Sequence, residues 1–176
     1  ESWDKSSPIT RVNVACSTEE GITVPYQEPY ITELQRLFDG INQAHGTIWA
    51  WNKYADLDHL WAAGHTLDNL RVLDLMWAWH YLQSDLPRGL GFVSPLASDF
   101  GAWKHWAHDP ARFGEYAAAD ALQTWRCGHW IVNALKAAGQ WQLFLEDWHE
   151  RDVYVLRPAH TVGVPVDRAA LVAFHE

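Results

Sequence analysis

The sequence is poor in positive charge, in sulfur and in long apolar runs. It has 13 Lys plus Arg against 22 Asp plus Glu, a formal charge of −9 that repels a phosphate backbone. No basic cluster offsets this charge, so nucleic acid is a disfavoured partner. The apolar run Val72–Trp79 is interrupted by Asp74. A membrane-spanning helix needs about 20 apolar residues, so the sequence predicts a soluble protein without a transmembrane segment.

Several sequence signatures of enzymes are also missing. No phosphate-binding loop, dinucleotide fingerprint or serine-elbow pattern occurs, which disfavours nucleotide-dependent chemistry and serine hydrolases of that type. The two cysteines, Cys16 and Cys127, are too few for a disulfide scaffold or a four-cysteine zinc site. They either close one long loop or remain two thiols. The first residue is Glu1, which is expected of a chain that begins within its gene or has lost a targeting peptide.

Aromatic residues and histidine are abundant instead. The 176 residues include 12 Trp, 6 Tyr, 6 Phe and 10 His, and 48% of the residues are hydrophobic. A chain of this size buries about 70% of its unfolded surface, so it needs neither a metal nor a disulfide to be stable. We expect one folded domain.

The first half of the chain alternates between turn residues and apolar periodicity. Residues 1–27 are expected to form an extended arm, with a small hairpin formed by two alternating β-branched runs. From Pro29 the apolar spacing becomes helical, which predicts helices over residues 29–46, 47–64 and 66–84. The third of these is apolar on most sides and is expected to be central.

The second half contains the longest predicted helix. The connection 86–97 is rich in Pro and Gly and is expected to be irregular, and a short helix is expected over 98–107. Helices are predicted over 109–139 and 140–151, followed by a β element at 152–166 and a final helical turn in the tail from Arg168. The fold class is therefore mainly α: a single domain of about six helices, with an arm over 1–27 and a helical domain over 28–176.

Two histidines occur on predicted apolar helix faces. His129 follows Trp125 by four residues, and His80 follows Trp77 by three. We expect each to be a neutral core imidazole with one hydrogen bond. The alternative is that the two converge on a ligand.

Carboxylate and histidine pairs at helical spacing suggest a metal site. Glu146 with His149, and Asp56 with His59, each place two potential ligands one turn apart on one helix face. Di-metal carboxylate bundles use this element together with further Glu residues, for which Glu33 is one candidate and Glu115 another. The hypothesis implies Zn or Fe, whereas the simpler interpretation is surface pairing within each helix.

A third chemical hypothesis uses Cys127 as a nucleophile. A helix that carries Cys127, followed by a strand with His160 near its start, resembles the layout of papain-like amidases. That resemblance implies a thiolate and imidazole pair. Cys127 falls in mid-helix, however, and Arg126 and Gly128 depart from the residues that flank the nucleophile in that family.

Tryptophan provides the main indication of function. If about a third of the Trp surface stays exposed, it amounts to about 800 Å², more than a monomer shows as one patch. Helical phasing assigns Trp51, Trp77 and Trp125 to the core. The candidates for partner contact lie near termini, connections or polar neighbours: Trp3, Trp103, Trp106, Trp141 and Trp148.

These observations favour a non-enzymatic structural or interaction subunit of a larger assembly. Such a protein would bind other protein subunits through its Trp-rich surfaces and its N-terminal arm, and would be oligomeric or complex-bound. The alternatives are a metal-dependent helical-bundle enzyme with the Asp56, His59, Glu146 and His149 site, and the Cys127–His160 amidase.

Overall fold

A computed structural model describes residues 8–67, 69–163 and 165–175, and the side chains of residues 149, 153, 160, 161 and 175 lie outside this description. The described chain is mainly helical, with two small two-stranded sheets. It divides into two compact units, Glu1–Leu135 and Lys136–Glu176. None of the helices in the described ranges combines the length and apolar character needed to cross a bilayer.

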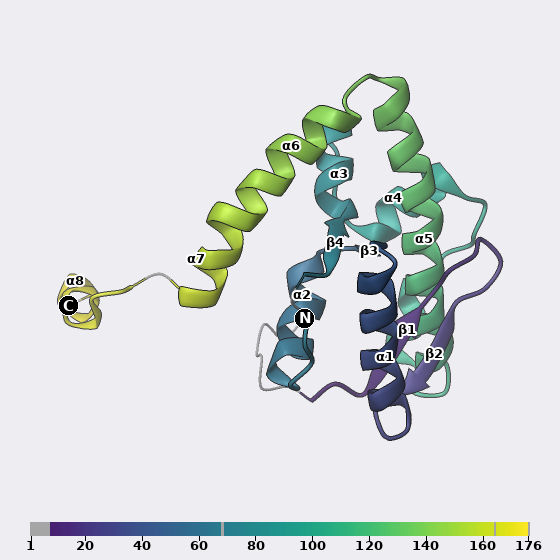
Figure 1. Ribbon diagram of the computed structural model, residues 1–176, viewed down its shortest axis with the longest axis horizontal. Helices are drawn as coiled ribbons and strands as arrows, with labels where there is room; N and C mark the ends of the chain where they lie inside the picture. Colours follow the sequence, from purple (N-terminus) through teal and green to yellow (C-terminus); the bar gives the residue numbers. More distant parts are fainter. Residues whose placement is uncertain (1–7, 68, 164, 176) are drawn as a thin grey trace. The chain divides into compact units, whose positions relative to one another are not determined.

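Residues 11–25 form the small hairpin expected within the arm 1–27, and this hairpin is packed rather than irregular. Strands β1 (Arg11–Val14) and β2 (Ile22–Pro25) pair antiparallel, with Val12 opposite Val24, as the alternating valines predicted. The loop between them lies against helix α5 (Phe113–Ala137), where Arg126 donates to the carbonyl of Thr18 at 2.8 Å. A Cβ at Gly21 would overlap the carbonyl of Ala118, so only glycine permits this approach. The hairpin is therefore fixed to α5 (Figure 1).

Helix α1 (Tyr30–Gln43) follows the hairpin, as predicted. It buries Leu34 and Phe38 in a cluster to which later segments contribute Leu57, Leu67 and Leu70. Val12 and Tyr26 from the hairpin pack against this cluster. A buried histidine lies at its edge: His65 is 8% exposed. Its Nδ1 donates to Gln35 and its Nε2 accepts from Tyr26, which fixes a neutral tautomer.

The predicted helices over 47–64 and 66–84 are each wrong in their first part. Each begins with a strand, β3 (Thr47–Ala50) or β4 (Arg71–Asp74), and continues as a helix, α2 (Lys53–Ala62) or α3 (Leu75–Leu82). The two strands pair parallel, with Ile48 opposite Val72. Strand pairing across 24 residues overrides the helical spacing because both strands bury apolar side chains only when they meet.

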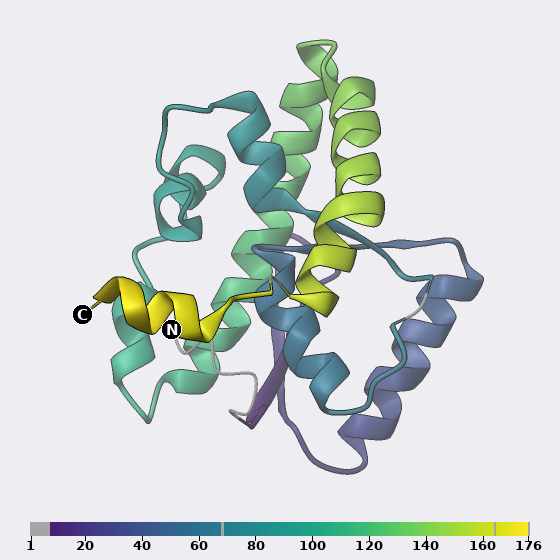
Figure 2. The same cartoon turned by 90° about the vertical axis from the view of Figure 1, so that its left-hand side faces the viewer.

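The region between α3 and α5 also differs from the prediction. Residues 86–97 contain helix α4 (Leu90–Ala97), with Pro95 in its last turn, and the helix expected over 98–107 is reduced to a 3₁₀ turn at Lys104–His108. Ser94 of α4 donates to Gln123 of α5 at 2.8 Å. The long helix predicted from residue 109 is α5, which runs vertically in both views (Figures 1 and 2).

In its described residues, the second unit contains only helices. Helix α6 (Trp141–Arg151) was predicted, but the β element expected at 152–166 is wrong. The chain instead continues through a π-helical turn, Asp152–Leu156, into α7 (Arg157–Val162). Helix propagation from α6 overrides the weak β preference of the alternating valines, because extending a helix adds one hydrogen bond per residue fixed. Helix α8 (Arg168–His175) is the last element that the structure describes.

The core assignments of several aromatic residues need correction. His129 is exposed, although it lies edge-on to the rings of Trp49 and Trp125 at 5.0 Å from each. His80 is half-buried, and its Nδ1 has no hydrogen-bond partner among the described residues. Trp51, Trp77 and Trp125 are likewise half-buried. The tryptophans most completely buried among the described residues are Trp79 and Trp103, at 1% and 2% exposure.

Candidate functional site

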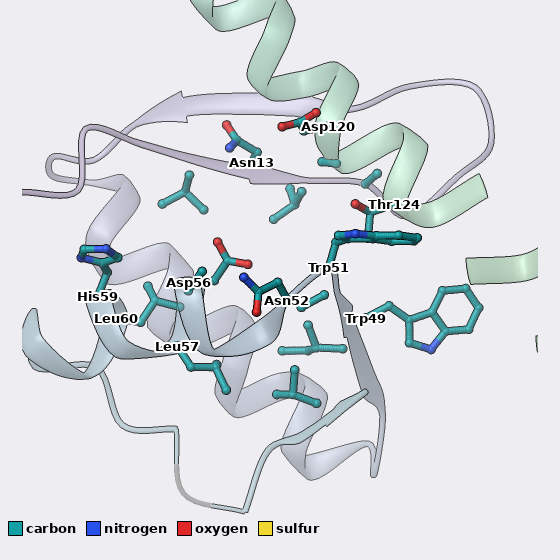
Figure 3. Close-up of a pocket in the computed structure, with 18 of the residues that line it drawn as sticks. Asn13, Trp49, Trp51, Asn52, Asp56, Leu57, His59, Leu60, Asp120 and Thr124 are labelled. Atoms are coloured by element: carbon teal, nitrogen blue, oxygen red, sulfur yellow. The ribbon is translucent and has the colours of Figure 1, made fainter. Parts of the chain in front are cut away.

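A cavity of about 1350 Å³ lies within the first unit, between the β1–β2 hairpin, strand β3, helix α2 and helix α5 (Figure 3). Its polar wall begins where β3 ends, at Trp51 and Asn52. The carboxyl ends of parallel strands are the usual place for a ligand in sheets with helical crossovers. The volume exceeds the roughly 300–1000 Å³ of ordinary ligand pockets, so the cavity has room for a small organic molecule and for water.

The ends of the two parallel strands are held together by Asp74. Its carboxylate accepts hydrogen bonds from the amides of Asn52 at 3.2 Å, Lys53 at 3.0 Å and Met76 at 3.0 Å. Asp74 and Lys53 have no exposed surface. Burial raises the pKa of Asp74, while the three amides and the positive charge of Lys53 oppose that shift. Asp74 therefore caps α3 and also anchors the start of α2.

The backbone turns sharply at Asn52 before α2 begins. Asn52 has a φ of 63°, the left-handed conformation that asparagine tolerates better than most residues. This turn carries the chain from β3 into α2 and places the first turn of that helix along the cavity wall (Figure 3). The position of Asp56, in that first turn, thus depends on the Asp74 hydrogen bonds.

Trp49 and Trp51 are among the residues that line the cavity, most of which are aliphatic or polar. Trp49 of β3 lies 5.2 Å from Trp125 of α5, centroid to centroid, and its indole rests on Gly128. A Cβ at Gly128 would overlap that indole, so glycine allows β3 and α5 to approach this closely. The indole nitrogen of Trp51 donates to the carbonyl of Arg88 at 3.0 Å. These contacts hold two large apolar surfaces beside the cavity.

Asp56 is an acid of this wall whose pKa is raised by its surroundings. Its side chain borders the open space of the cavity, so it is exposed to water there while protein atoms surround it on the other sides. This enclosure, together with the charges of Asp74 and Asp120, raises the pKa of Asp56 to about 6. Among the described residues, the Asp56 carboxylate makes no hydrogen bond or ion pair.

The other carboxylate labelled in Figure 3 is already paired. Asp120 of α5 accepts from the indole nitrogen of Trp103 and from the ammonium of Lys104, both at 2.6 Å. Neutral polar groups complete this part of the wall: Asn13 of the hairpin, whose Oδ1 accepts from Thr23, and Thr124 of α5. The cavity therefore combines apolar side chains with a few polar groups and the carboxylate of Asp56, for which the described residues supply no hydrogen bond or ion pair.

The proposed metal ligands lie in different units. Asp56 and His59 both border the cavity from α2, whereas Glu146 lies on α6 and accepts from Gln142 at 3.1 Å. The side chain of His149 lies outside the described part. Within the described residues, no three His, Cys, Asp or Glu side chains are grouped so that they could hold a metal ion. The chemistry of these residues therefore gives no support to Zn or Fe.

The tryptophans proposed for partner contact have different environments. Trp103 is 2% exposed and Trp148 is 9% exposed. Trp106 and Trp141 are half-buried, and the guanidinium of Arg112 lies 3.7 Å from the ring centre of Trp106. Trp3 lies outside the described residues. Burial leaves Trp103 and Trp148 little surface for a partner in this fold.

The two cysteines are separate thiols in contrasting environments. Cys16 is exposed and Cys127 is buried, and neither is in a disulfide. Burial raises the pKa of the Cys127 thiol to about 12, which disfavours the thiolate that a nucleophile needs. The side chain of His160 is not among those that the structure describes.

Sequence reasoning missed the residues that build the site. Asp74 was noticed only as an interruption in an apolar run, and Asn52 and Lys53 were assigned to the interior of a helix. One local signal was present: an acid that ends a short apolar run and directly precedes a helical pattern is typical of a strand followed by an N-cap. The cavity itself had no sequence signal, because it depends on the docking of the hairpin onto α5.

The comparisons with known proteins assign no family to the chain. No protein-family model matches it, and neither the curated proteins nor the solved structures searched give a match. The function is therefore inferred from the cavity of the first unit and from the exposed surfaces of the chain.

Proposed function

We propose that the first unit is a ligand-binding module that holds a small organic molecule in the cavity beside Asp56. The observation that carries this proposal is an open cavity of about 1350 Å³ with a mostly apolar wall that includes Trp51 and the Asp56 carboxylate. Ligand sites are concave and mostly apolar, with a few polar groups that fix the orientation of the ligand. The proposal is one of binding and assigns no catalytic step.

Two features of the walls support a site for an organic molecule. The apolar surface comes from rings that are held in place, since Trp49 rests on Gly128 and Trp51 donates to Arg88. Rigid walls reduce the entropy lost on binding. The polar groups Asn13, Asn52, Asp56 and Thr124 come from three segments of the chain and are drawn around the same space in Figure 3.

A blocking substitution tests this proposal. Ala55 lies on the cavity wall one residue before Asp56, so Ala55→Trp should fill part of the space. Ala62 lies exposed at the end of the same helix and does not border the cavity, so Ala62→Trp is the matched control. Ligand-observed NMR with 2-phenylethanol should show binding to the wild type and to Ala62→Trp, and weaker binding to Ala55→Trp. Absence of binding to the wild type, or equal binding to all three proteins, would contradict the proposal.

A second proposal concerns the unit Lys136–Glu176, which we propose contacts another protein subunit. The supporting observation is the exposure of its large apolar side chains, several of which exceed half of their full surface: Leu143, Tyr154, Val155, Val162, Val166, Leu171, Val172 and Phe174. Exposed apolar surface on this scale is typical of an interaction site. An interaction subunit is thus still proposed, with the contact made by these aliphatic residues, Tyr154 and Phe174 instead of tryptophans.

Light scattering with size-exclusion chromatography tests this second proposal. Phe174 is 89% exposed on α8, so Phe174→Asp should weaken self-association or association with an added partner. Phe92 is 42% exposed on α4 in the first unit, and Phe92→Asp serves as the control. A wild-type chain that remains a monomer without aggregating, even when concentrated, would count against the proposal.

A further inference from the structure

The positive groups in the cavity wall are engaged with other parts of the protein. The ammonium of Lys104 pairs with Asp120 at 2.6 Å. The Nε of Arg11 donates to Thr23 at 2.9 Å, and the guanidinium of Arg88 lies 5.2 Å from the ring centre of Trp77. An anionic ligand would have to compete with these contacts for each of the three cations.

The acids that line the cavity are Glu20, Asp56, Asp58 and Asp120. Asp56 has no hydrogen-bond or ion-pair partner among the residues that the structure describes, although it lies in a site where Asp74 and Asp120 are both satisfied. Burial and the negative charges of Asp74 and Asp120 make the ionised form of Asp56 costly. A ligand cation placed beside Asp56 would remove that cost, and the formal charge of −9 would favour its approach.

The aromatic walls suit a cation on an organic body. Two rings that border the cavity already lie near ammonium groups of the protein: Tyr54 is 5.2 Å from the Nζ of Lys53, and Tyr116 is 5.3 Å from that of Lys104. Trp51 offers further ring surface in the same wall. The face of an indole attracts a cation within about 6 Å and also buries apolar carbon.

A metal ion fits this wall less well than an amine. No group of three metal-binding side chains occurs in the described ranges, and a divalent ion needs several oxygen or nitrogen ligands. One carboxylate in a mostly apolar cavity is sufficient for an ammonium group. We propose that the cavity binds an organic cation, an amine carried on an apolar or aromatic body, with Asp56 as its counterion. This proposal rests on the proposed ligand-binding function of the first unit.

Matched probes of one shape and three charges test the proposal. Phenethylamine, 2-phenylethanol and phenylacetate present a similar ring with a cation, a neutral group and an anion. Calorimetric titration of the full chain near neutral pH should show phenethylamine binding at least about tenfold more tightly than 2-phenylethanol, the factor that one charge-assisted hydrogen bond supplies. Phenylacetate should bind most weakly.

Two variants separate a charge effect from a general loss of structure. Asp56→Asn keeps the size of the side chain and should remove the preference for the amine over 2-phenylethanol. Asp85→Asn makes the same change of net charge in an exposed turn outside the cavity and should keep the preference. Circular dichroism of both variants establishes that they are folded.

The outcomes distinguish this proposal from the one on which it rests. Equal affinity of the wild type for the amine and the alcohol, or the same amine preference in Asp56→Asn, overturns the cation proposal while ligand binding stands. Tighter binding of phenylacetate also overturns it. If none of the three probes binds at about millimolar concentration, both proposals fail.

Discussion

The carboxylate of Asp74, the last residue of β4, accepts a hydrogen bond from the amide of Lys53, the first residue of α2, at 3.0 Å. This contact joins the end of one parallel strand to the helix that follows the other. It places the first turn of α2, and with it Asp56, at the cavity. The geometry of the candidate site thus depends on a buried residue that does not border the cavity.

Removal of Asp74 should therefore destabilise the first unit strongly. Asp74→Ala leaves three amides without an acceptor and deprives the buried ammonium of Lys53 of a neighbouring carboxylate. Leaving a buried charge and buried amides without this compensation costs about 3–5 kcal/mol. Urea unfolding followed by far-UV circular dichroism measures the loss, with the exposed Asp85→Ala as the control. A loss of less than about 1 kcal/mol would show that Asp74 does not anchor the two strand ends.

The approach of Trp49 to α5 gives a second prediction. Gly128→Ala adds a Cβ that would lie 2.7 Å from Cζ3 of Trp49 and 2.9 Å from Cδ1 of Leu75. We expect a loss of about 1–3 kcal/mol from overpacking, despite the better helix propensity of alanine. Gly40→Ala in α1 is the control, since nothing lies near its added Cβ, and it should stabilise the protein by about 0.5–1 kcal/mol. Equal unfolding free energies for the two variants would contradict this packing.

Asp56 should make the unliganded protein less stable at neutral pH. Its pKa is raised to about 6 in the folded chain from 3.8, so the unfolded chain loses this proton at a lower pH than the folded chain does. The folded state is consequently favoured below about pH 4, and that advantage disappears as the pH rises through 6. Asp56→Asn should exceed the wild type in stability by about 1 kcal/mol at pH 8, a value reduced because the carboxylate faces water in the cavity.

Thermal unfolding at several pH values measures this effect. The gain from Asp56→Asn should shrink as the pH falls through 6 and vanish below about pH 4. Asp85→Asn should show no comparable trend. A wild type that is more stable than Asp56→Asn at pH 8 would mean that Asp56 has a stabilising partner in the folded protein. A stabilising substitution that abolishes amine binding is the behaviour expected of a functional residue.

The two cysteines should differ in their reactivity toward an alkylating reagent. Iodoacetamide should modify the exposed Cys16 in the native protein and leave Cys127 unmodified, because Cys127 is buried and its pKa is about 12. Mass spectrometry should find one adduct in the native state and two after unfolding in urea. Modification of native Cys127 would revive the hypothesis of a nucleophilic thiol.

Local sequence patterns predicted the segments whose structure depends on near neighbours. The hairpin around Val12 and Val24, helix α1 and helix α5 all have strong periodicity or turn signals. Strands β3 and β4 were missed because their apolar residues also fit a helical period, and a parallel pair forms only through a distant partner. In 152–166 the alternating valines predicted strands, but the chain is helical over residues 152–162.

The candidate site was predictable only in part. The spacing of Asp56 and His59 correctly placed both residues on one helix, which borders the cavity, and the metal site that it suggested stays a prediction. The pairing of β3 with β4 and the docking of the hairpin onto α5 create the cavity. Both are long-range events, and neither is encoded in the residues next to Asp56.

A crystal structure of the full chain with phenethylamine is the most direct test of the cation site. The account predicts the ammonium nitrogen about 2.7–2.9 Å from a carboxylate oxygen of Asp56, with the phenyl ring against the aromatic wall that includes Trp51. An ammonium group that points away from Asp56, or an Asp56 carboxylate already paired with another side chain of the protein, would contradict it.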